Sequence, residues 1–287
     1  MPLYEDYYYQ SSDGLRLYAR DYSHPAPAQT IVCLHGLTRN AADFDEIAAL
    51  LADEHRVIVP EQRGRGRSQY DPDSSRYQLP TYVKDMFDLL AELQLEQVVL
   101  LGTSMGGLMA MLMTASRPGL AAKVILNDVG PVVAQAGLTR IQGYVGKTEP
   151  VKTWADAIDQ AREHNVAAFP DYADEDWNRF ARALYRESSE GQPVLAYDPA
   201  IAQPLAASAE AAVPTDLWSV FDAMAGVPLL LIRGALSDIL DQNCVEQMRK
   251  RRPDLGYVEV PNRGHAPMLN EAICVENILD FLRDGAP

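Results

Sequence analysis

The stretch Gly102-Thr103-Ser104-Met105-Gly106 decides the fold prediction, because it joins two runs of different character. Val98–Leu101 before it is short and entirely apolar, which is typical of a buried strand, and Met105–Ser116 after it has the length and composition of a helix. A G-x-S-x-G sequence at such a junction predicts a tight strand-to-helix turn that lifts the serine hydroxyl out of the sheet. Ser104 is therefore the candidate nucleophile.

Apolar runs of the same kind recur along the chain and alternate with helix-like stretches. The expected strands are Thr30–Leu34, Arg56–Val59, Val98–Leu101, Lys123–Leu126, Val227–Ile232 and Gly256–Val260, and the expected helices are Ala41–Leu51, Tyr82–Leu93, Met105–Ser116, Val245–Arg251 and Leu269–Arg283. This alternation predicts a parallel sheet covered by helices on both faces. Ahead of it, Tyr7–Gln10 and Leu15–Tyr22 predict a leading hairpin.

The alternation stops between residues 131 and 216, where the sequence becomes rich in alanine and acidic residues with scattered aromatic side chains. Several short helices are expected there in place of strands. The prediction is therefore one α/β core interrupted by a helical insertion. Residues 1–130 form the first part of the core, residues 131–216 the insertion, and residues 217–287 the second part of the core.

A serine hydroxyl needs a neighbouring base to become a nucleophile. His265 follows the last expected strand and precedes the last expected helix, so its side chain is expected at the same strand ends as Ser104. Two carboxylates compete for the place beside this imidazole. Asp238, which follows the strand ending at Ile232, is the preferred acid, and Asp128, which follows the preceding strand, is the alternative.

An acyl-transfer site also needs backbone N–H donors for the negative charge that develops on the attacked oxygen. The expected donors are the amide of Met105, directly after the candidate nucleophile, and the amide of Leu37, in the loop after the Thr30–Leu34 strand.

Together these motifs resemble those of the α/β-hydrolase superfamily, in the branch with a helical cap domain. The segments that carry the resemblance are His35-Gly36, Arg63–Ser68, the turn around Ser104, Asn127–Pro131, Ser237-Asp238 and Gly264-His265. The resemblance implies the α/β-hydrolase fold, with a mostly parallel eight-stranded sheet. It also implies a catalytic triad of Ser104, Asp238 and His265, and no metal or organic cofactor.

By the same resemblance, the expected enzyme is a serine hydrolase that cleaves a carboxylic ester, lactone or thioester of a small or medium apolar acid through an acyl-enzyme. One alternative is a carbon–carbon bond hydrolase acting on a ring-fission diketone, which is disfavoured because Ala266, not tryptophan, follows the histidine. The other is a ligand-binding homologue with little turnover. A serine at the turn argues against epoxide hydrolases and haloalkane dehalogenases, which need a carboxylate nucleophile.

The composition limits the class of partner. The 287 residues include 25 Lys and Arg against 40 Asp and Glu, giving a net charge of -15, which disfavours nucleic acids and anionic membranes as partners. The three cysteines are widely spaced, so neither a zinc site nor a disulfide framework is expected. With no basic-then-apolar segment at the amino terminus, we expect a cytoplasmic protein with a small-molecule substrate.

Overall fold

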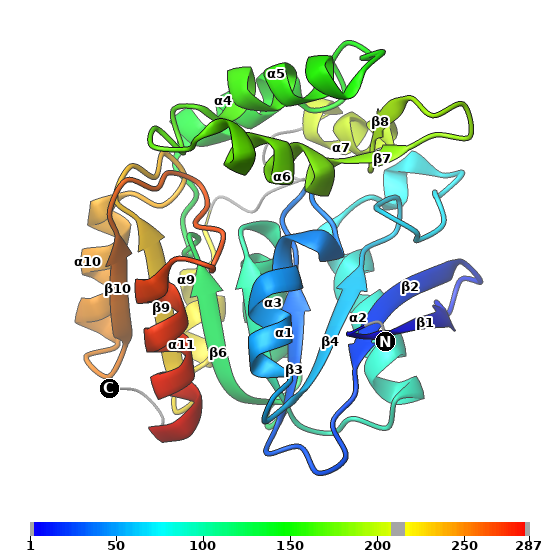
Figure 1. The fold of residues 1–287 in the computed structure, drawn as a ribbon. Coiled ribbons are helices and arrows are strands. Elements are labelled where there is room, and N and C mark those ends of the chain that lie inside the picture. The colour runs from blue at the N-terminus through cyan, green and yellow to red at the C-terminus, as the bar shows by residue number, and fades with distance from the viewer. Residues whose placement is uncertain (1–2, 208–215, 285–287) are drawn as a thin grey trace.

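The computed structural model describes residues 3–207 and 216–284 and is built around one large sheet (Figure 1). Its eight strands lie in the order β1-β2-β4-β3-β5-β6-β9-β10. Their bounds are β1 Glu5–Gln10, β2 Arg16–Tyr22, β3 Thr30–Leu34, β4 Arg56–Glu61, β5 Val98–Thr103, β6 Ala121–Asn127, β9 Leu229–Gly234 and β10 Gly256–Val260. The β1–β2 and β2–β4 pairs are antiparallel, and the other pairs are parallel. The predicted fold class is therefore confirmed.

Two layers of helices cover the two faces of the sheet, one in front of the strands and one behind them in the view of Figure 1. One layer holds α2 (Leu79–Glu92), α3 (Met105–Ser116), α9 (Trp218–Ala223) and α10 (Gln242–Arg251), and the other holds α1 (Asp45–Leu51) and α11 (Ala272–Asp284). Because side chains alternate along a strand, neighbours in β3 such as Val32 and Cys33 enter different hydrophobic clusters. This double burial explains why the strands read as continuous apolar runs.

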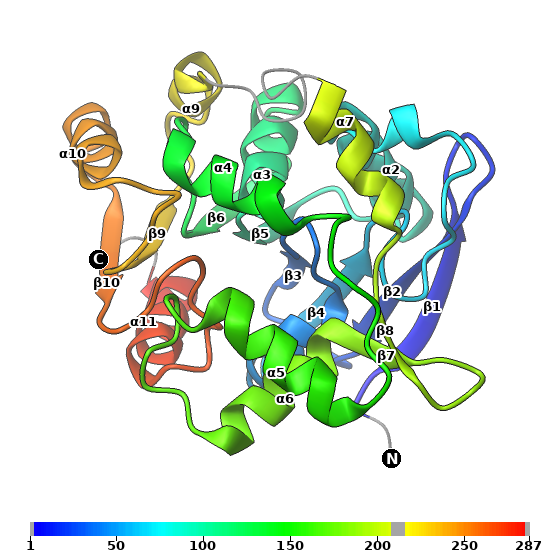
Figure 2. The same ribbon diagram turned by 90° about the horizontal axis from the view of Figure 1, so that it is seen from above.

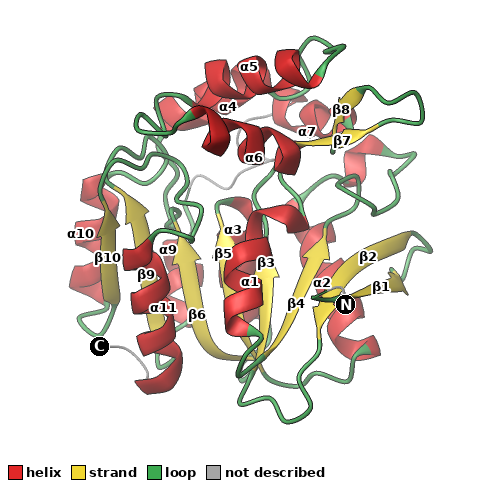
Figure 3. Ribbon diagram, in the orientation of Figure 1, coloured by secondary structure: helices red, strands yellow, loops and turns green. Residues whose placement is uncertain are grey.

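The described part of the segment between β6 and α9 lies over the carboxyl ends of the parallel strands (Figure 3). We call its described part, residues 131–207, the cap. It contains α4 (Gln135–Tyr144), α5 (Trp154–Asn165), α6 (Asp174–Leu184), β7 (Tyr185–Glu187), β8 (Pro193–Leu195), the short helix η3 (Pro199–Ile201) and α7 (Ala202–Ala207). Residues 208–215 of the expected insertion lie outside the described residues, and its boundaries stay a prediction.

The sequence missed the β7–β8 pair in the cap. These antiparallel strands have three residues each, which is too short for an alternating pattern to stand out. Within the cap, α5 and α6 bury an aromatic cluster of their own that includes Phe169, Trp177 and Phe180. Many of the aromatic side chains scattered through this segment therefore serve packing. No helix in residues 3–207 or 216–284 is long and apolar enough to cross a lipid bilayer.

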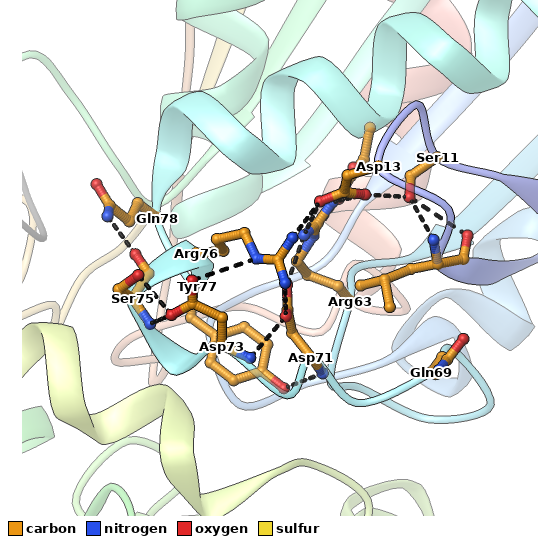
Figure 4. Close-up of polar contacts among 12 residues, drawn as sticks. Ser11, Asp13, Arg63, Gln69, Asp71, Asp73, Ser75, Arg76, Tyr77 and Gln78 are labelled. Carbon is orange, nitrogen blue, oxygen red and sulfur yellow. Dashed lines mark hydrogen bonds and ion pairs between the residues drawn. The ribbon is translucent and has the colours of Figure 1, made fainter.

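A buried arginine fixes the core loop beneath one end of the cap. The Arg63 side chain is 1% exposed and forms ion pairs with Asp13, Asp71 and Asp85 at 2.6–2.8 Å. Arg76 reaches Asp13 and Asp71 from the other side (Figure 4). A buried guanidinium is tolerated because several carboxylates surround it. Two of the arginines in the Arg63–Ser68 segment, Arg63 and Arg65, are therefore part of the interior.

This network continues into the cap through Tyr77. The Tyr77 hydroxyl accepts a hydrogen bond from the Asp71 N–H at 2.8 Å and donates one to the Asp198 carboxylate of the cap at 2.6 Å. The Asp198 N–H in turn donates to the Gly64 carbonyl oxygen at 2.8 Å. The Arg63–Ser68 loop therefore anchors the cap above the ends of the strands.

Candidate active site

Ser104 lies in the turn between β5 and α3, where the G-x-S-x-G spacing predicts it. Its φ of 54° and ψ of -119° are strained for a residue with a side chain. A Cβ at Gly102 would lie 2.3 Å from the Gly106 carbonyl oxygen, and a Cβ at Gly106 would lie 2.0 Å from the Leu34 carbonyl oxygen. Both flanking positions therefore require glycine, and the turn lifts the Ser104 hydroxyl to the amino-terminal end of α3.

His265 bridges Ser104 to a buried carboxylate, and that carboxylate is Asp128. The His265 Nε2 atom is 2.8 Å from the Ser104 Oγ atom, and its Nδ1 atom is 2.7 Å from the Asp128 Oδ2 atom. With the proton on Nδ1, the imidazole donates to Asp128 and accepts from the serine hydroxyl. The structure thus brings together two of the three preferred residues and the alternative acid.

The expected pairing of His265 with Asp238 is wrong in this geometry. The Asp238 carboxylate binds the Arg140 guanidinium through two hydrogen bonds, Nε to Oδ2 at 2.6 Å and Nη2 to Oδ1 at 2.9 Å. Strands β6 and β9 are parallel neighbours, so the loops that follow them open at the same edge of the sheet. From the sequence, Asp128 after β6 and Asp238 after β9 could therefore both reach His265. The path of each loop determines that Asp128 does so.

The Asp128 carboxylate is fully buried and held by two further donors. Its Oδ1 atom accepts from the Gly234 N–H at 2.9 Å, and its Oδ2 atom accepts from the Ser237 hydroxyl at 2.7 Å. The Ser237-Asp238 motif therefore contributes to the site through its serine. The sequence analysis preferred Asp238 and kept Asp128 as the alternative, and it is Asp128 that contacts His265.

The two expected oxyanion donors lie beside the serine. In the part of the chain that the structure describes, neither the Leu37 N–H nor the Met105 N–H donates to a protein acceptor. A Cβ on Gly36 would lie 3.7 Å from the Ser104 Cβ, so this loop runs directly past the candidate nucleophile. The fully buried Arg65 holds the loop in place by donating from Nε to the Leu37 carbonyl oxygen at 2.9 Å. The sequence did not find this supporting role.

Comparison with known proteins identifies the family. The sequence model described as the Alpha/beta hydrolase family matches residues 31–276. The chain belongs to the α/β-hydrolase family.

Similar proteins agree with this assignment. The chain is 37% identical over 258 residues to the 3-hydroxybutyrate-oligomer hydrolase of Cupriavidus necator, covering 88% of this chain and 87% of that protein. A crystal structure of an α/β hydrolase from Novosphingobium aromaticivorans matches with a TM-score of 0.92 at 42% identity, covering 98% and 99% of the two chains. A putative hydrolase from Rickettsia typhi matches with a TM-score of 0.87 at 27% identity and 99% coverage of both chains. This α/β hydrolase is therefore an enzyme of the hydrolase class.

Two cavities meet at Ser104 in this α/β hydrolase. The first, which we call the polar cavity, has a volume of about 110 Å³, and the second, the apolar cavity, has about 50 Å³. The polar cavity takes its name from the side chains of Ser104, Arg39, Arg140, Tyr144, His164 and His265, although most of its wall is apolar and includes Phe169, Phe180 and Leu184. The apolar cavity is lined by Ser104, Met105, Leu108, Val129, Ile201 and Ile239, among others. Leu37 and Ile141 line both.

The polar side chains that the cap contributes were not found from the sequence. Arg140 and Tyr144 come from α4, which lies over the start of α3 and the ends of β5 and β6 (Figure 2). His164 comes from α5 and stacks on the Tyr144 ring, with centroids 5.8 Å apart. Burial raises the pKa of the Tyr144 hydroxyl, so this group stays protonated and can donate a hydrogen bond. The sequence feature that could have indicated these cap residues is the four-residue spacing of Arg140 and Tyr144, which places both on one face of a helix.

The described residues hold no group of three or more His, Cys, Asp and Glu side chains that could bind a metal ion.

His35 lies next to the expected oxyanion loop and bonds to the main chain. It contacts the Gly36 carbonyl oxygen through Nδ1 at 2.7 Å and accepts a hydrogen bond from the Gln62 N–H through Nε2 at 3.0 Å. Burial lowers the pKa of His35 to about 3, so its imidazole is neutral at ordinary pH.

Proposed function

We propose that this α/β hydrolase is a serine hydrolase that cleaves carboxylic esters through an acyl-enzyme on Ser104. The observation that carries the proposal is the unbroken hydrogen-bond chain from the Ser104 hydroxyl through His265 to Asp128, with distances of 2.8 and 2.7 Å. These are the contacts that let an imidazole take the proton of an attacking serine while a carboxylate fixes its tautomer. Asp128 takes the role that the sequence assigned to Asp238.

The reaction runs in two halves. The Ser104 oxygen attacks the ester carbonyl while His265 Nε2 accepts the hydroxyl proton, and His265 then gives this proton to the departing alcohol oxygen. Water, deprotonated by the same imidazole, attacks the acyl-enzyme and releases the acid. Asp128 stabilises the imidazolium that forms in each half.

The oxyanion of each tetrahedral intermediate is expected to bind the N–H groups of Leu37 and Met105. These donors lack protein acceptors among the described residues, and they flank the nucleophile. The amino-terminal end of the twelve-residue helix α3 adds a favourable dipole for the negative charge. Fixed donors of this kind are worth about 10²–10³ in turnover each.

A short hydroxy acid ester is the best first substrate. The support comes from the 37% identity to a 3-hydroxybutyrate-oligomer hydrolase over most of both chains. The small apolar cavity beside Met105 suits a short acyl chain. Lactones and thioesters would use the same acyl-enzyme, and a ring-fission diketone tests the carbon–carbon alternative. The cytoplasmic location remains a proposal. The net charge of -15 favours a small-molecule partner over nucleic acids or anionic membranes.

The experiment is active-site labelling combined with turnover. The wild-type protein should hydrolyse p-nitrophenyl acetate and take up one fluorophosphonate group, and Ser104→Ala should do neither while keeping the melting temperature of a folded protein. Intact-mass measurement counts the labels, and loss of the label in Ser104→Ala places it on Ser104. If the wild type neither turns over esters nor reacts with the probe, the ligand-binding alternative is favoured. If Ser104→Ala keeps ester turnover, the proposal is wrong.

A further inference from the structure

The position of His265 assigns the two cavities to the two halves of an ester. In the described part of the chain, His265 lines the polar cavity and is absent from the wall of the apolar cavity. The imidazole must hand its proton to the departing oxygen, so the alcohol half of the substrate has to lie on the His265 side of Ser104. The polar cavity therefore receives the alcohol, and the apolar cavity receives the acyl chain.

The alcohol side carries two guanidinium groups. Arg39 and Arg140 both line the polar cavity. The Nε and Nη2 groups of each arginine donate hydrogen bonds to one aspartate. Asp43 holds Arg39 at 2.5–3.0 Å, and Asp238 holds Arg140 at 2.6–2.9 Å. A guanidinium has five N–H donors, so an aspartate on this edge leaves the Nη1 group for another acceptor.

Tyr144 connects these arginines to the catalytic loop. Its side chain lines the polar cavity together with Arg140 and with Thr38, the residue after the expected oxyanion donor Leu37. Arg39 is close enough to the Tyr144 hydroxyl to favour its ionised form electrostatically. Polar side chains of the cap and of the loop beside Ser104 thus face the same cavity. None of these groups has a role in the serine–histidine chemistry itself.

We propose that the polar cavity binds the free carboxylate of the departing alcohol, with Arg140 as the specificity-determining residue. This inference rests on the proposed function. The substrate class is then an ester whose alcohol half is itself a hydroxy acid. The enzyme would remove the carboxyl-terminal unit of a hydroxy acid oligomer: the acyl carbon–oxygen bond breaks, the Ser104 oxygen keeps the acyl group, and the freed hydroxy acid oxygen takes the proton from His265. Water then releases the acyl group as a second acid.

Charge supports this choice of ligand. A protein with a net charge of -15 repels anions on the whole, so an anionic substrate needs a local cation at the site. Arginine suits the task because its planar fork matches a carboxylate. In the absence of substrate, Asp238 holds the Arg140 guanidinium in place and balances its positive charge. Although burial alone would raise it, the hydrogen bonds and charge of Arg140 hold the pKa of Asp238 below its usual value, so the pair stays charged at neutral pH.

The competing interpretation is that the Arg140–Asp238 ion pair is a strut, that is, a purely structural link between the cap and the loop after β9. The two interpretations differ in substrate selectivity. A strut affects every ester alike, whereas a carboxylate-binding residue distinguishes a charged alcohol half from a neutral one of the same shape. The test therefore compares the linear dimer of 3-hydroxybutyrate with the same dimer whose terminal carboxylate is a primary amide.

The readout is the ratio of kcat/KM for the acid dimer to that for the amide dimer. Wild type should favour the acid, and the double variant Arg140→Gln/Asp238→Asn, which removes both charges together, should lower the ratio roughly 10- to 100-fold, the worth of a charged hydrogen bond. The matched control is Arg162→Gln/Asp174→Asn, another arginine–aspartate pair of the cap that lines neither cavity. The control should keep the wild-type ratio.

An unchanged ratio in a folded Arg140→Gln/Asp238→Asn variant would overturn the inference in favour of a strut. If that variant does not fold, the wild type decides alone: the acid dimer must be the better substrate, and added salt must weaken its kcat/KM more than that of the amide dimer. Equal cleavage of both dimers would refute carboxylate binding but leave the ester hydrolase intact. Failure to cleave any ester would instead refute the proposed function.

Discussion

Replacing Asp128 with asparagine should abolish most turnover by reversing the tautomer of His265. The Asp128 Oδ1 atom accepts from the Gly234 N–H, while Oδ2 accepts from His265 and from the Ser237 hydroxyl. An asparagine must place its NH₂ group at one of these two positions. The Gly234 amide can only donate, whereas the Ser237 hydroxyl can rotate and the imidazole can exchange its proton. The NH₂ group is therefore expected to face His265, which forces the ring proton onto Nε2.

With its proton on Nε2, His265 can no longer accept the Ser104 hydroxyl proton, so kcat should fall by about 10⁴, as for the same change in a serine protease triad. Asp238→Asn leaves the three catalytic contacts in place, and its effect on a small neutral ester should be about 10-fold or less, the worth of one weakened hydrogen bond.

The assay is hydrolysis of p-nitrophenyl acetate by both variants at the same pH, with nitrogen-15 NMR to report which imidazole nitrogen carries the proton. Thermal melting shows that each variant is folded. A larger loss for Asp238→Asn than for Asp128→Asn, or an Asp128→Asn protein with the ring proton still on Nδ1, would refute the reasoning.

Two further predictions concern stability. Gly106→Ala should destabilise the fold by about 3 kcal/mol or more in urea denaturation, because its Cβ would meet a backbone oxygen; Gly143→Ala, on the open surface of α4, should change stability by less than about 1 kcal/mol, and equal effects would contradict the steric argument. Burial lowers the pKa of His35 to about 3. Below pH 6.5 the His35 imidazole is therefore protonated in the unfolded chain but stays neutral in the folded protein. Stability should therefore fall by about 2 kcal/mol from pH 6.5 to pH 5, and a folded His35→Gln variant should lose that part of the pH dependence; an identical pH profile would refute it.

Much of the fold could be predicted from the sequence because its causes are local. A strand buried on both faces must be apolar throughout, so β3, β5 and β9 stand out as continuous runs. The turn at Ser104 needs glycine on both sides for steric reasons that operate within a few residues. Such constraints act on neighbouring positions, and neighbouring positions are what a sequence displays.

The acid partner of His265 could be identified only from the tertiary structure. Asp128 and Asp238 follow adjacent parallel strands, so both could reach His265 in principle. The path of the loop after β9 decided between them, since it turns Ser237 toward Asp128 and leaves Asp238 facing Arg140 of the cap.

Sequence alone determined that a strained serine would stand at the end of a parallel strand, because short-range sterics and strand burial leave few other ways to fold that turn. Only the tertiary structure decided which acid contacts the His265 imidazole and which cap side chains line the cavities beside Ser104. Those choices depend on how α4 and two loops, far apart in the chain, lie across the ends of the sheet, and no local pattern encodes a contact between them.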